Sequence, residues 1–423
     1  MARLGSVLKK LSGKKTGKLE KRWDFTVGEP LISAPFVGKD YDGNYVIIFA
    51  TTRGKVYVLS TDKKVRWTFE IEETLDEIQM LFADKERSKT VSTIPLFEDI
   101  DGDQRKEIVV GSENGKLYVI DHEGKLKWEF QTKGTIRSTP ILYDAGSPHG
   151  KILLFGSSDH LLYALDGKGK NIWTFMAESG IESSPSVLLK GGRDDQIVFG
   201  DNKGYVYGIS PLGRLLWKFK TGGQIRAKPI ITELISNPEH RQTILIGSYD
   251  KNFYALDEQG NPIWHFSSEG SIRSTAAVED INQDGRKEIV FGSNDNRVYA
   301  LNDRGEKLWS YETDFWVVDR PLIVDLDNDK KFEIIVGSYD ASLYVLDSQG
   351  EFMLNYIPGV SAVAMQSGSY SDQITTDPGH YTGKKLWEYK LDSLIVGTGF
   401  EQDNHEIVVS TRDGKVSVFV HRE

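Results

Sequence analysis

The sequence predicts an all-β protein, and three observations support that prediction. The 423 residues include 41 Gly, 18 Tyr and 19 Phe, a composition that favours strands and turns over helices. Short β-branched and aromatic runs recur along the chain, with Gly-containing turns between them, as β-hairpins require. One pattern returns about every 45 residues, so we expect copies of a single supersecondary unit.

The repeated pattern is clearest at Leu117-Tyr-Val-Ile-Asp121, which is followed by Gly124 and then by Trp128-Glu-Phe130. Five of the seven spacings between the central positions of the copies lie between 44 and 47 residues. This length is typical of one blade of a β-propeller. The central positions are Tyr57, Tyr118, Tyr163, Tyr207, Tyr254, Tyr299, Tyr344 and Ser417.

Each copy is interpreted as four short strands. The first strand carries a proline in most copies, the second is β-branched, the third is the Leu-Tyr-Val-Leu-Asp-like run, and the fourth is Trp-x-Phe. The Trp of one copy and the Pro of the next lie 12 residues apart, as in Trp128 and Pro140. A constant offset of this kind indicates one unit repeated radially around an axis.

The length of the chain predicts eight blades. Without the 22-residue N-terminal tail and the excess in the two long spacings, 357 residues remain, which is 7.9 periods of 45. The chain opens at Trp23-Asp-Phe25, a fourth-strand motif, and finishes with Val416-Ser-Val-Phe-Val420, a third-strand motif. Pairing residues 22–27 with the last strand would complete the eighth blade and remove an exposed sheet edge. The sequence therefore predicts an eight-bladed propeller of four-stranded blades, closed by its N-terminal strand.

The domain organisation follows from this repeat. A basic tail over 1–22 precedes a propeller over 23–423, which is interrupted by insertions at about 71–90 and 358–390. The first insertion has a capping-box spacing that predicts a short helix. Both Leu354-Asn-Tyr356 and Trp387-Glu-Tyr389 fit the fourth strand of blade seven, and the sequence leaves the choice open.

The repeat resembles the pyrroloquinoline-quinone-type propeller repeat, found in quinoprotein dehydrogenases and in BamB-like outer-membrane assembly scaffolds. The resemblance covers most of 23–423 and implies the propeller fold, but not a function, because catalytic and binding members share the repeat. It also implies that the repeated tryptophans dock neighbouring blades. These are Trp67, Trp128, Trp173, Trp217, Trp264 and Trp309, with Trp23 and Trp387 as further candidates.

Three loops between first and second strands carry acids at alternating positions, and they resemble the FG-GAP calcium loops of integrin-type propellers. Oxygen ligands spaced in this way can converge on one hard cation such as calcium. At position six, where the sharp turn prefers Gly, only the second loop has one, Gly285. The alternative is a solvated Asp/Asn turn. The candidate ligands are Asp99, Asp101, Asp103 and Glu107, then Asp280, Asn282, Asp284 and Glu288, then Asp325, Asp327, Asp329 and Glu333.

A second candidate site is the mouth of the central channel. Charged residues precede the proline of the innermost strand in blades three to seven, so they are expected to ring the channel. Arginines focused on a narrow mouth can hold a carboxylate or phosphate. The alternative, which we favour slightly, is that Arg and Glu of neighbouring blades pair as a structural ring. The predicted mouth residues are Arg137, Glu182, Arg226, Arg273, Asp319 and Arg320.

Composition excludes several other classes of function. With no Cys, the chain has no disulfide, no thiolate metal site and no cysteine nucleophile. The formal net charge of −10 argues against a nucleic-acid partner. No apolar run approaches the roughly 20 residues that span a bilayer, and membrane contact is expected only through the basic tail. A cytoplasmic location is expected.

These observations favour a non-catalytic scaffold that binds protein partners through its loops and insertions, within a larger assembly. Calcium is a candidate stabilising ion. The alternatives are a quinone-dependent oxidoreductase and a calcium-dependent adhesion or ligand-sensing propeller. The chain lacks the adjacent cysteine pair of quinoprotein dehydrogenases, so no pyrroloquinoline quinone is expected. The eight His residues show no metal-ligand spacing, and no nucleophile elbow is present.

Overall fold

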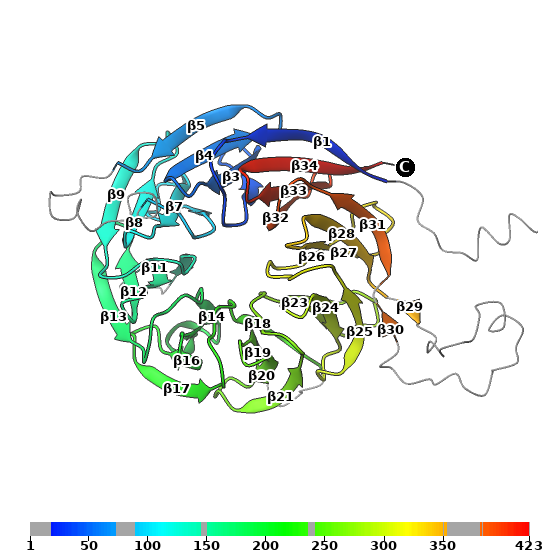
Figure 1. Ribbon diagram of the computed structural model, residues 1–423. Coiled ribbons are helices and arrows are strands. Elements are labelled where there is room, and N and C mark those ends of the chain that lie inside the picture. The colour runs from blue at the N-terminus through cyan, green and yellow to red at the C-terminus, as the bar shows by residue number, and fades with distance from the viewer. Residues whose placement is uncertain are drawn as a thin grey trace, which may run out of the picture.

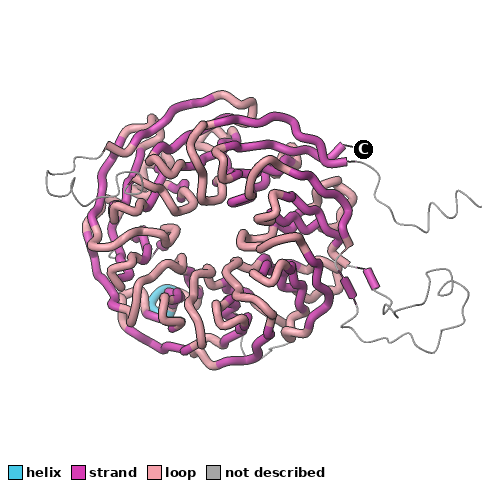
Figure 2. The backbone as a smooth tube through the Cα atoms, viewed as in Figure 1, coloured by secondary structure: helices cyan, strands magenta, loops and turns pink. Residues whose placement is uncertain are grey.

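The computed structural model describes residues 18–72, 89–144, 150–235, 242–349, 351–352, 381–382 and 384–422. These residues form eight sheets arranged as a ring (Figure 1). Strands and loops make up nearly all of the described chain, and its one short helix is a 3-10 turn at Gly192–Asp194 (Figure 2). The predicted eight-bladed propeller is confirmed. No described helix is long and apolar enough to cross a membrane.

Seven blades have four strands each, numbered here from the innermost outward. Blade one contains β2 (Phe36–Lys39), β3 (Tyr45–Ala50), β4 (Lys55–Ser60) and β5 (Val65–Glu70). Blade two contains β6 (Leu96–Glu98), β7 (Glu107–Gly111), β8 (Lys116–Ile120) and β9 (Leu126–Gln131). Blade three contains β10 (Ile141–Asp144), β11 (Lys151–Gly156), β12 (Leu161–Asp166) and β13 (Asn171–Met176). Blade four contains β14 (Ser186–Leu188), β15 (Gln196–Gly200), β16 (Tyr205–Ile209) and β17 (Leu215–Lys220).

The second half of the ring repeats the same order. Blade five contains β18 (Ile230–Thr232), β19 (Thr243–Gly247), β20 (Asn252–Leu256) and β21 (Pro262–Ser267). Blade six contains β22 (Ala277–Glu279), β23 (Glu288–Ser293), β24 (Arg297–Leu301) and β25 (Lys307–Glu312). Blade seven contains β26 (Leu322–Val324), β27 (Glu333–Gly337), β28 (Ser342–Asp347) and β31 (Lys385–Lys390). Blade eight contains β32 (Ile395–Glu401), β33 (Glu406–Thr411), β34 (Lys415–Arg422) and β1 (Lys18–Thr26).

The ring closes where the two ends of the described chain meet. The first strand, β1, pairs antiparallel with the last, β34, from Lys18 opposite Arg422 to Thr26 opposite Lys415 (Figure 1). The predicted closure is confirmed, although the strand begins earlier than the expected residues 22–27. A register shift between Lys21 and Trp23 interrupts the pairing, and the pairing continues beyond it to Lys18.

The structure decides the open choice in blade seven. Strand β31 carries Trp387 opposite Val345 of β28, so the Trp387-Glu-Tyr389 motif is the fourth strand. The ends of the second insertion take another place. Strands β29 (Glu351–Phe352) and β30 (Tyr381–Thr382) extend the outer edge of blade six, where Thr382 pairs with Ser310 of β25.

The core consists of eight apolar clusters, one between each pair of neighbouring blades. Alternate residues of one middle strand face opposite neighbours: Ile48 of β3 packs toward blade two, whereas Ile47 packs toward blade eight. Middle strands are therefore buried on both faces and read as continuous apolar runs rather than as alternating ones.

The repeated tryptophans lie between blades. The indole of Trp128 donates a hydrogen bond to the Gly167 carbonyl of blade three at 3.1 Å, and Trp67, Trp173 and Trp309 make the corresponding bond to the following blade. Trp23 does so from blade eight to blade one. A Cβ atom on Gly169 would lie 2.7 Å from the Trp128 ring, so the turn above that tryptophan requires glycine. Trp217 and Trp264 lie beneath Gly260 and Gly305 in the same way.

Several predicted segments lie outside the described residues. They include 1–17 of the basic tail, 73–88 of the first insertion with its expected helix, and 358–380 of the second insertion.

Candidate functional site at the channel mouth

The mouth of the central channel is a cavity of about 450 Å³ at the inner ends of the blades. Its wall repeats from blade to blade, because each innermost segment contributes the residue three positions before its proline. The structure brings five such residues together around the cavity, in blades three to seven: Arg137, Glu182, Arg226, Arg273 and Val318. Asp319 also lines it.

A belt of hydrogen bonds fixes the spacing of these segments. The Ser138 hydroxyl donates to the Ser183 carbonyl of the next blade at 3.0 Å, and the Ser183 hydroxyl donates to the Ala227 carbonyl at 2.8 Å. In blade six the Ser274 hydroxyl donates to the Asp319 carbonyl at 2.7 Å. The inner segments therefore hold one another directly, and the charged residues beside them sit on a rigid frame.

The structure adds a second ring of mouth residues that sequence reasoning missed. Glu113, Tyr339 and Arg412 line the cavity, and each comes two residues after the last core position of its second strand. In each case the backbone N–H binds a carbonyl of the inner segment, as Glu113 does with Thr90 at 2.9 Å. A signal was present in the sequence: the residue after the Ser or Thr in each Gly-Ser or Ser-Thr pair recurs with the blade period.

One half of the mouth neutralises its own charges. The Arg137 guanidinium donates to both carboxylate oxygens of Glu113, at 2.8 and 2.9 Å, and lies 3.3 Å from Glu182. Glu182 in turn lies 3.2 Å from the Arg226 guanidinium, which stacks over the Tyr249 ring at 5.4 Å. The pairing raises the pKa of Arg137. This arc matches the structural ring that the sequence allowed as the alternative.

The other half of the mouth carries basic side chains without acidic partners. Among the described residues, no ion pair joins Arg273 or Arg412 to a carboxylate. Lys228 and Arg320 each precede a proline, in the register position of Thr139 and Ser184, which line the mouth. Burial lowers the pKa of both groups, and the positive charge of Arg320 lowers that of Lys228 further. The two cations therefore share one region of the channel.

Asp319 has a role between blades. Its carboxylate accepts hydrogen bonds from the backbone N–H and the hydroxyl of Thr398 in blade eight, at 2.8 and 3.2 Å. Burial nonetheless raises the pKa of Asp319 to about 6, while those hydrogen bonds and the nearby Arg320 oppose the rise. Asp319 therefore joins blades seven and eight and contributes little free negative charge to the mouth.

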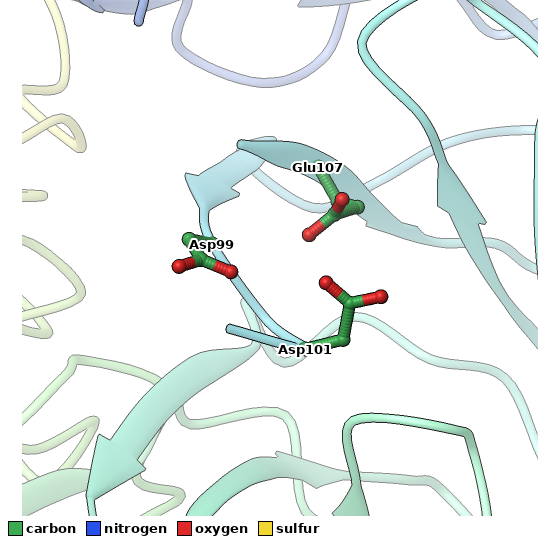
Figure 3. A group of neighbouring side chains, drawn as sticks. All are labelled: Asp99, Asp101 and Glu107. Atoms are coloured by element: carbon green, nitrogen blue, oxygen red, sulfur yellow. The ribbon is translucent and has the colours of Figure 1, made fainter. Parts of the chain in front are cut away.

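The first acidic loop contains its own cation. Asp99, Asp101 and Glu107 bring carboxylate oxygens within 4.8 Å of one another (Figure 3). The Lys127 ammonium lies 2.5 Å from Asp101, 2.9 Å from Glu107 and 4.0 Å from Asp103. These contacts raise the pKa of Lys127 against the effect of burial. A lysine ammonium thus contacts three of the four side chains predicted to hold a metal.

The other two loops have the same backbone but a different neighbour. The residue at position six has positive φ in all three, at +71° for Gln104, +87° for Gly285 and +69° for Lys330, so the sharp turn forms even without glycine. The counterpart of Lys127, just before the blade tryptophan, is Leu308 in blade six and Leu386 in blade seven.

The acids of these two loops lie close together. Asp325, Asp327 and Glu333 bring carboxylate oxygens within 4.8 Å of one another. Glu288 is 2 % exposed, and burial together with the charges of Asp284 and Asp280 raises its pKa to about 7. Both loops therefore hold buried acids that a cation would stabilise.

An exposed aromatic pair lies beside the mouth. The Phe315 and Trp316 side chains are 44 % and 42 % exposed, and their rings stack with centroids 5.1 Å apart. The Trp316 carbonyl accepts a hydrogen bond from the backbone N–H of Tyr339, a mouth residue. The pair therefore borders the half of the mouth that lacks acidic partners.

Comparison with known families identifies the propeller. Residues 88–179, 188–277 and 255–373 match the family described as the lambda-carrageenase beta-propeller domain, and together they span more than half of the chain. The chain belongs to the lambda-carrageenase beta-propeller domain family. The matches to this propeller family begin and end within blades and overlap at 255–277, as expected for a chain of similar repeats. The sequence matches no curated protein.

Solved structures share the fold of this carrageenase-type propeller. Sqt1 from Saccharomyces cerevisiae is 11% identical with a TM-score of 0.64, over 96% of this chain and 99% of its own. BamB from Moraxella catarrhalis is 17% identical with a TM-score of 0.61, over 95% and 97%. BBS1N, solved in complex with ARL6DN, is 11% identical with a TM-score of 0.50, over 78% and 92%. At such identities the likeness shows the fold alone.

Proposed function

We propose that the chain is a non-catalytic propeller scaffold that binds a protein partner on the face of the channel mouth. The observation that carries the proposal is the exposed, stacked pair of Phe315 and Trp316. Large aromatic side chains are enriched at the energetic centre of protein interfaces. The structural neighbour BBS1N was solved in a complex with another protein, which agrees with a binding role for such a disc.

The fold itself does not require this aromatic pair. In the matching turn of blade two the two positions hold Gly134 and Thr135, and in blade five they hold Gly270 and Ser271. The turn is otherwise alike, since the Thr313 hydroxyl donates to the Phe315 carbonyl as the Thr132 hydroxyl does to the Gly134 carbonyl. Two aromatic rings exposed at one turn of eight are therefore best explained by a contact that the isolated chain does not make.

The test replaces the pair and compares the proteins captured from native lysate. The double variant Phe315→Ser/Trp316→Ser should lose a partner that the wild-type chain retains. The matched control is Leu215→Ser/Leu216→Ser, which removes two similarly exposed apolar side chains from the outer strand β17. If the Phe315/Trp316 variant keeps every partner, this surface is not the binding site. Deleting 71–90 and 358–390 separately tests whether the predicted insertions also bind.

The proposal that the chain is not an enzyme has direct tests of its own. The family is named for an enzyme that acts on carrageenan, so release of reducing ends from lambda-carrageenan would contradict the proposal. Dye reduction with added pyrroloquinoline quinone and calcium would contradict it in favour of an oxidoreductase. We expect neither activity.

Calcium stabilisation is proposed for the loops of blades six and seven, and not for the loop of blade two. Carboxylate oxygens are ligands that calcium prefers, and the Lys127 ammonium already balances the acids of blade two. A cation that binds only the folded state raises its melting temperature.

The expected result is a higher melting temperature in calcium than in chelator, with a smaller rise for Glu333→Gln. The control Glu129→Gln removes an exposed carboxylate outside the loops and should respond as wild type does. Equal melting temperatures of the wild-type chain in calcium and in chelator would remove calcium from the proposal, and with it the adhesion or sensor alternative.

A further inference from the structure

The two halves of the mouth differ in charge balance. In the arc of blades two to five, each mouth arginine contacts a carboxylate, as Arg137 does with Glu113. In the arc of blades five to eight, Arg273 and Arg412 make no ion pair among the described residues. The whole chain is acidic, with a net charge of −10, so this arc is a local region of opposite sign.

Two further cations lie within the same arc. Lys228 and Arg320 occupy the same register position on either side of blade six, where the equivalent residue is Thr275, whose hydroxyl accepts the Lys228 backbone N–H at 3.2 Å. Arg320 keeps some contact with solvent, yet the surrounding channel wall lowers its pKa, and burial does the same to Lys228. Neither side chain donates to a protein acceptor among the described residues.

Such an arrangement is costly unless something neutralises it. Placing two like charges in a partly desolvated channel costs free energy, and the carboxylate nearest to them, Asp319, is already bound by Thr398. An anion between Lys228 and Arg320 would offset that cost. The field of a narrow, low-dielectric channel would also concentrate anions at its mouth.

We propose that this arc is a binding site for a small, multiply charged oxyanion that bears phosphate or carboxylate groups. Lys228 and Arg320 would bind its charges, and Arg273 and Arg412 would contact it from the rim. The guanidinium fork suits two oxygens of one phosphate or carboxylate, and the ammonium acts as a point charge. The cavity of about 450 Å³ lies in the size range of small-molecule sites. The site goes beyond the scaffold role and does not depend on the protein partner.

The experiment titrates pyrophosphate and citrate into the full chain at constant ionic strength, by calorimetry and by melting temperature. Wild-type protein should bind at least one probe, with a matching rise in melting temperature. Lys228→Met and Arg320→Met should each weaken binding at least tenfold, and Arg273→Gln should weaken it severalfold. The control Lys168→Met removes a cation from an exposed turn in blade three and should bind as wild type does.

Stability without the anion separates a binding role from a structural one. Because Lys228 is an unpaired, partly buried cation, Lys228→Met should melt at or above the wild-type temperature in anion-free buffer. A clear fall in melting temperature would assign Lys228 a structural role and overturn the proposal. No binding of either probe at millimolar concentration, or binding that Lys228→Met and Arg320→Met leave unchanged, would also overturn it. A response to an acidic peptide but to neither probe would assign the arc to a protein partner instead.

Discussion

Single residues with similar sequence positions have different roles in this propeller. Arg137, Arg226 and Arg273 are equivalent in the repeat, yet the first two contact Glu182 and the third contacts no carboxylate among the described residues. Lys127 supplies a positive charge to the acids of one loop, while Leu308 and Leu386 stand in its place in two others. The repeat therefore sets where a side chain lies, and its neighbours decide what it does.

Asp319 gives a prediction at this scale. Its pKa is about 6 in the folded protein, above its ordinary value of 3.8, so the folded state binds more protons between those values. The stability that Asp319 contributes is complete below pH 3.8 and is lost as the pH rises through 6, by up to about 3 kcal/mol.

Asp319→Asn should remove this pH dependence and still accept hydrogen bonds from Thr398. The measurement is urea unfolding of both proteins from pH 4 to pH 8, where the variant should gain relative stability as the pH rises. Asp42→Asn, which replaces an exposed carboxylate, controls for the loss of one charge. A constant difference between wild type and Asp319→Asn across this range would contradict the assignment.

At the scale of elements, the blades depend on one another. Each apolar cluster takes residues from two blades, and fourth-strand tryptophans bind a carbonyl of the following blade. A four-stranded blade with two apolar faces would be unstable alone, because each face needs a neighbour to leave water.

The tryptophans should therefore differ in their contribution according to burial. Trp309 is 1% exposed within the cluster of blades six and seven, so Trp309→Ala should lower the free energy of unfolding by about 3–5 kcal/mol. Trp67 makes the same hydrogen bond but is only partly buried, and Trp67→Ala should cost roughly half as much. Denaturant unfolding measures both, and equal losses would show that burial does not set the contribution.

At the scale of the whole molecule, closure depends on one strand. Without β1, blade eight would end at β34 and expose an unpaired edge. A chain that starts at Val27 should therefore melt at a lower temperature and aggregate more readily than a chain that starts at Lys18. A peptide with the sequence of Lys18–Thr26, added to the shortened chain, should restore part of the lost stability, and the same peptide with Trp23→Ala should restore less. Equal melting temperatures for the two chains would show that closure does not require this strand.

The sequence by itself determined the blade number, the four-strand pattern and the closure. All three follow from local signals, the strand periods and turn glycines, which repeat at a fixed interval. The positions of Arg137, Glu182, Arg226 and Arg273 around the mouth could be predicted for the same reason, since equivalent residues of a radial repeat lie on one circle.

Only the tertiary structure decided which of these charges are paired. The partners of Arg137 come from two other blades, Lys127 reaches its acids from the fourth strand of its blade, and Trp387 joins β28 across the second insertion. Such contacts depend on side-chain reach between segments far apart in the chain, which a one-dimensional period does not encode. The repeat placed the charges around the channel, and the contacts between blades left four of them without a carboxylate partner.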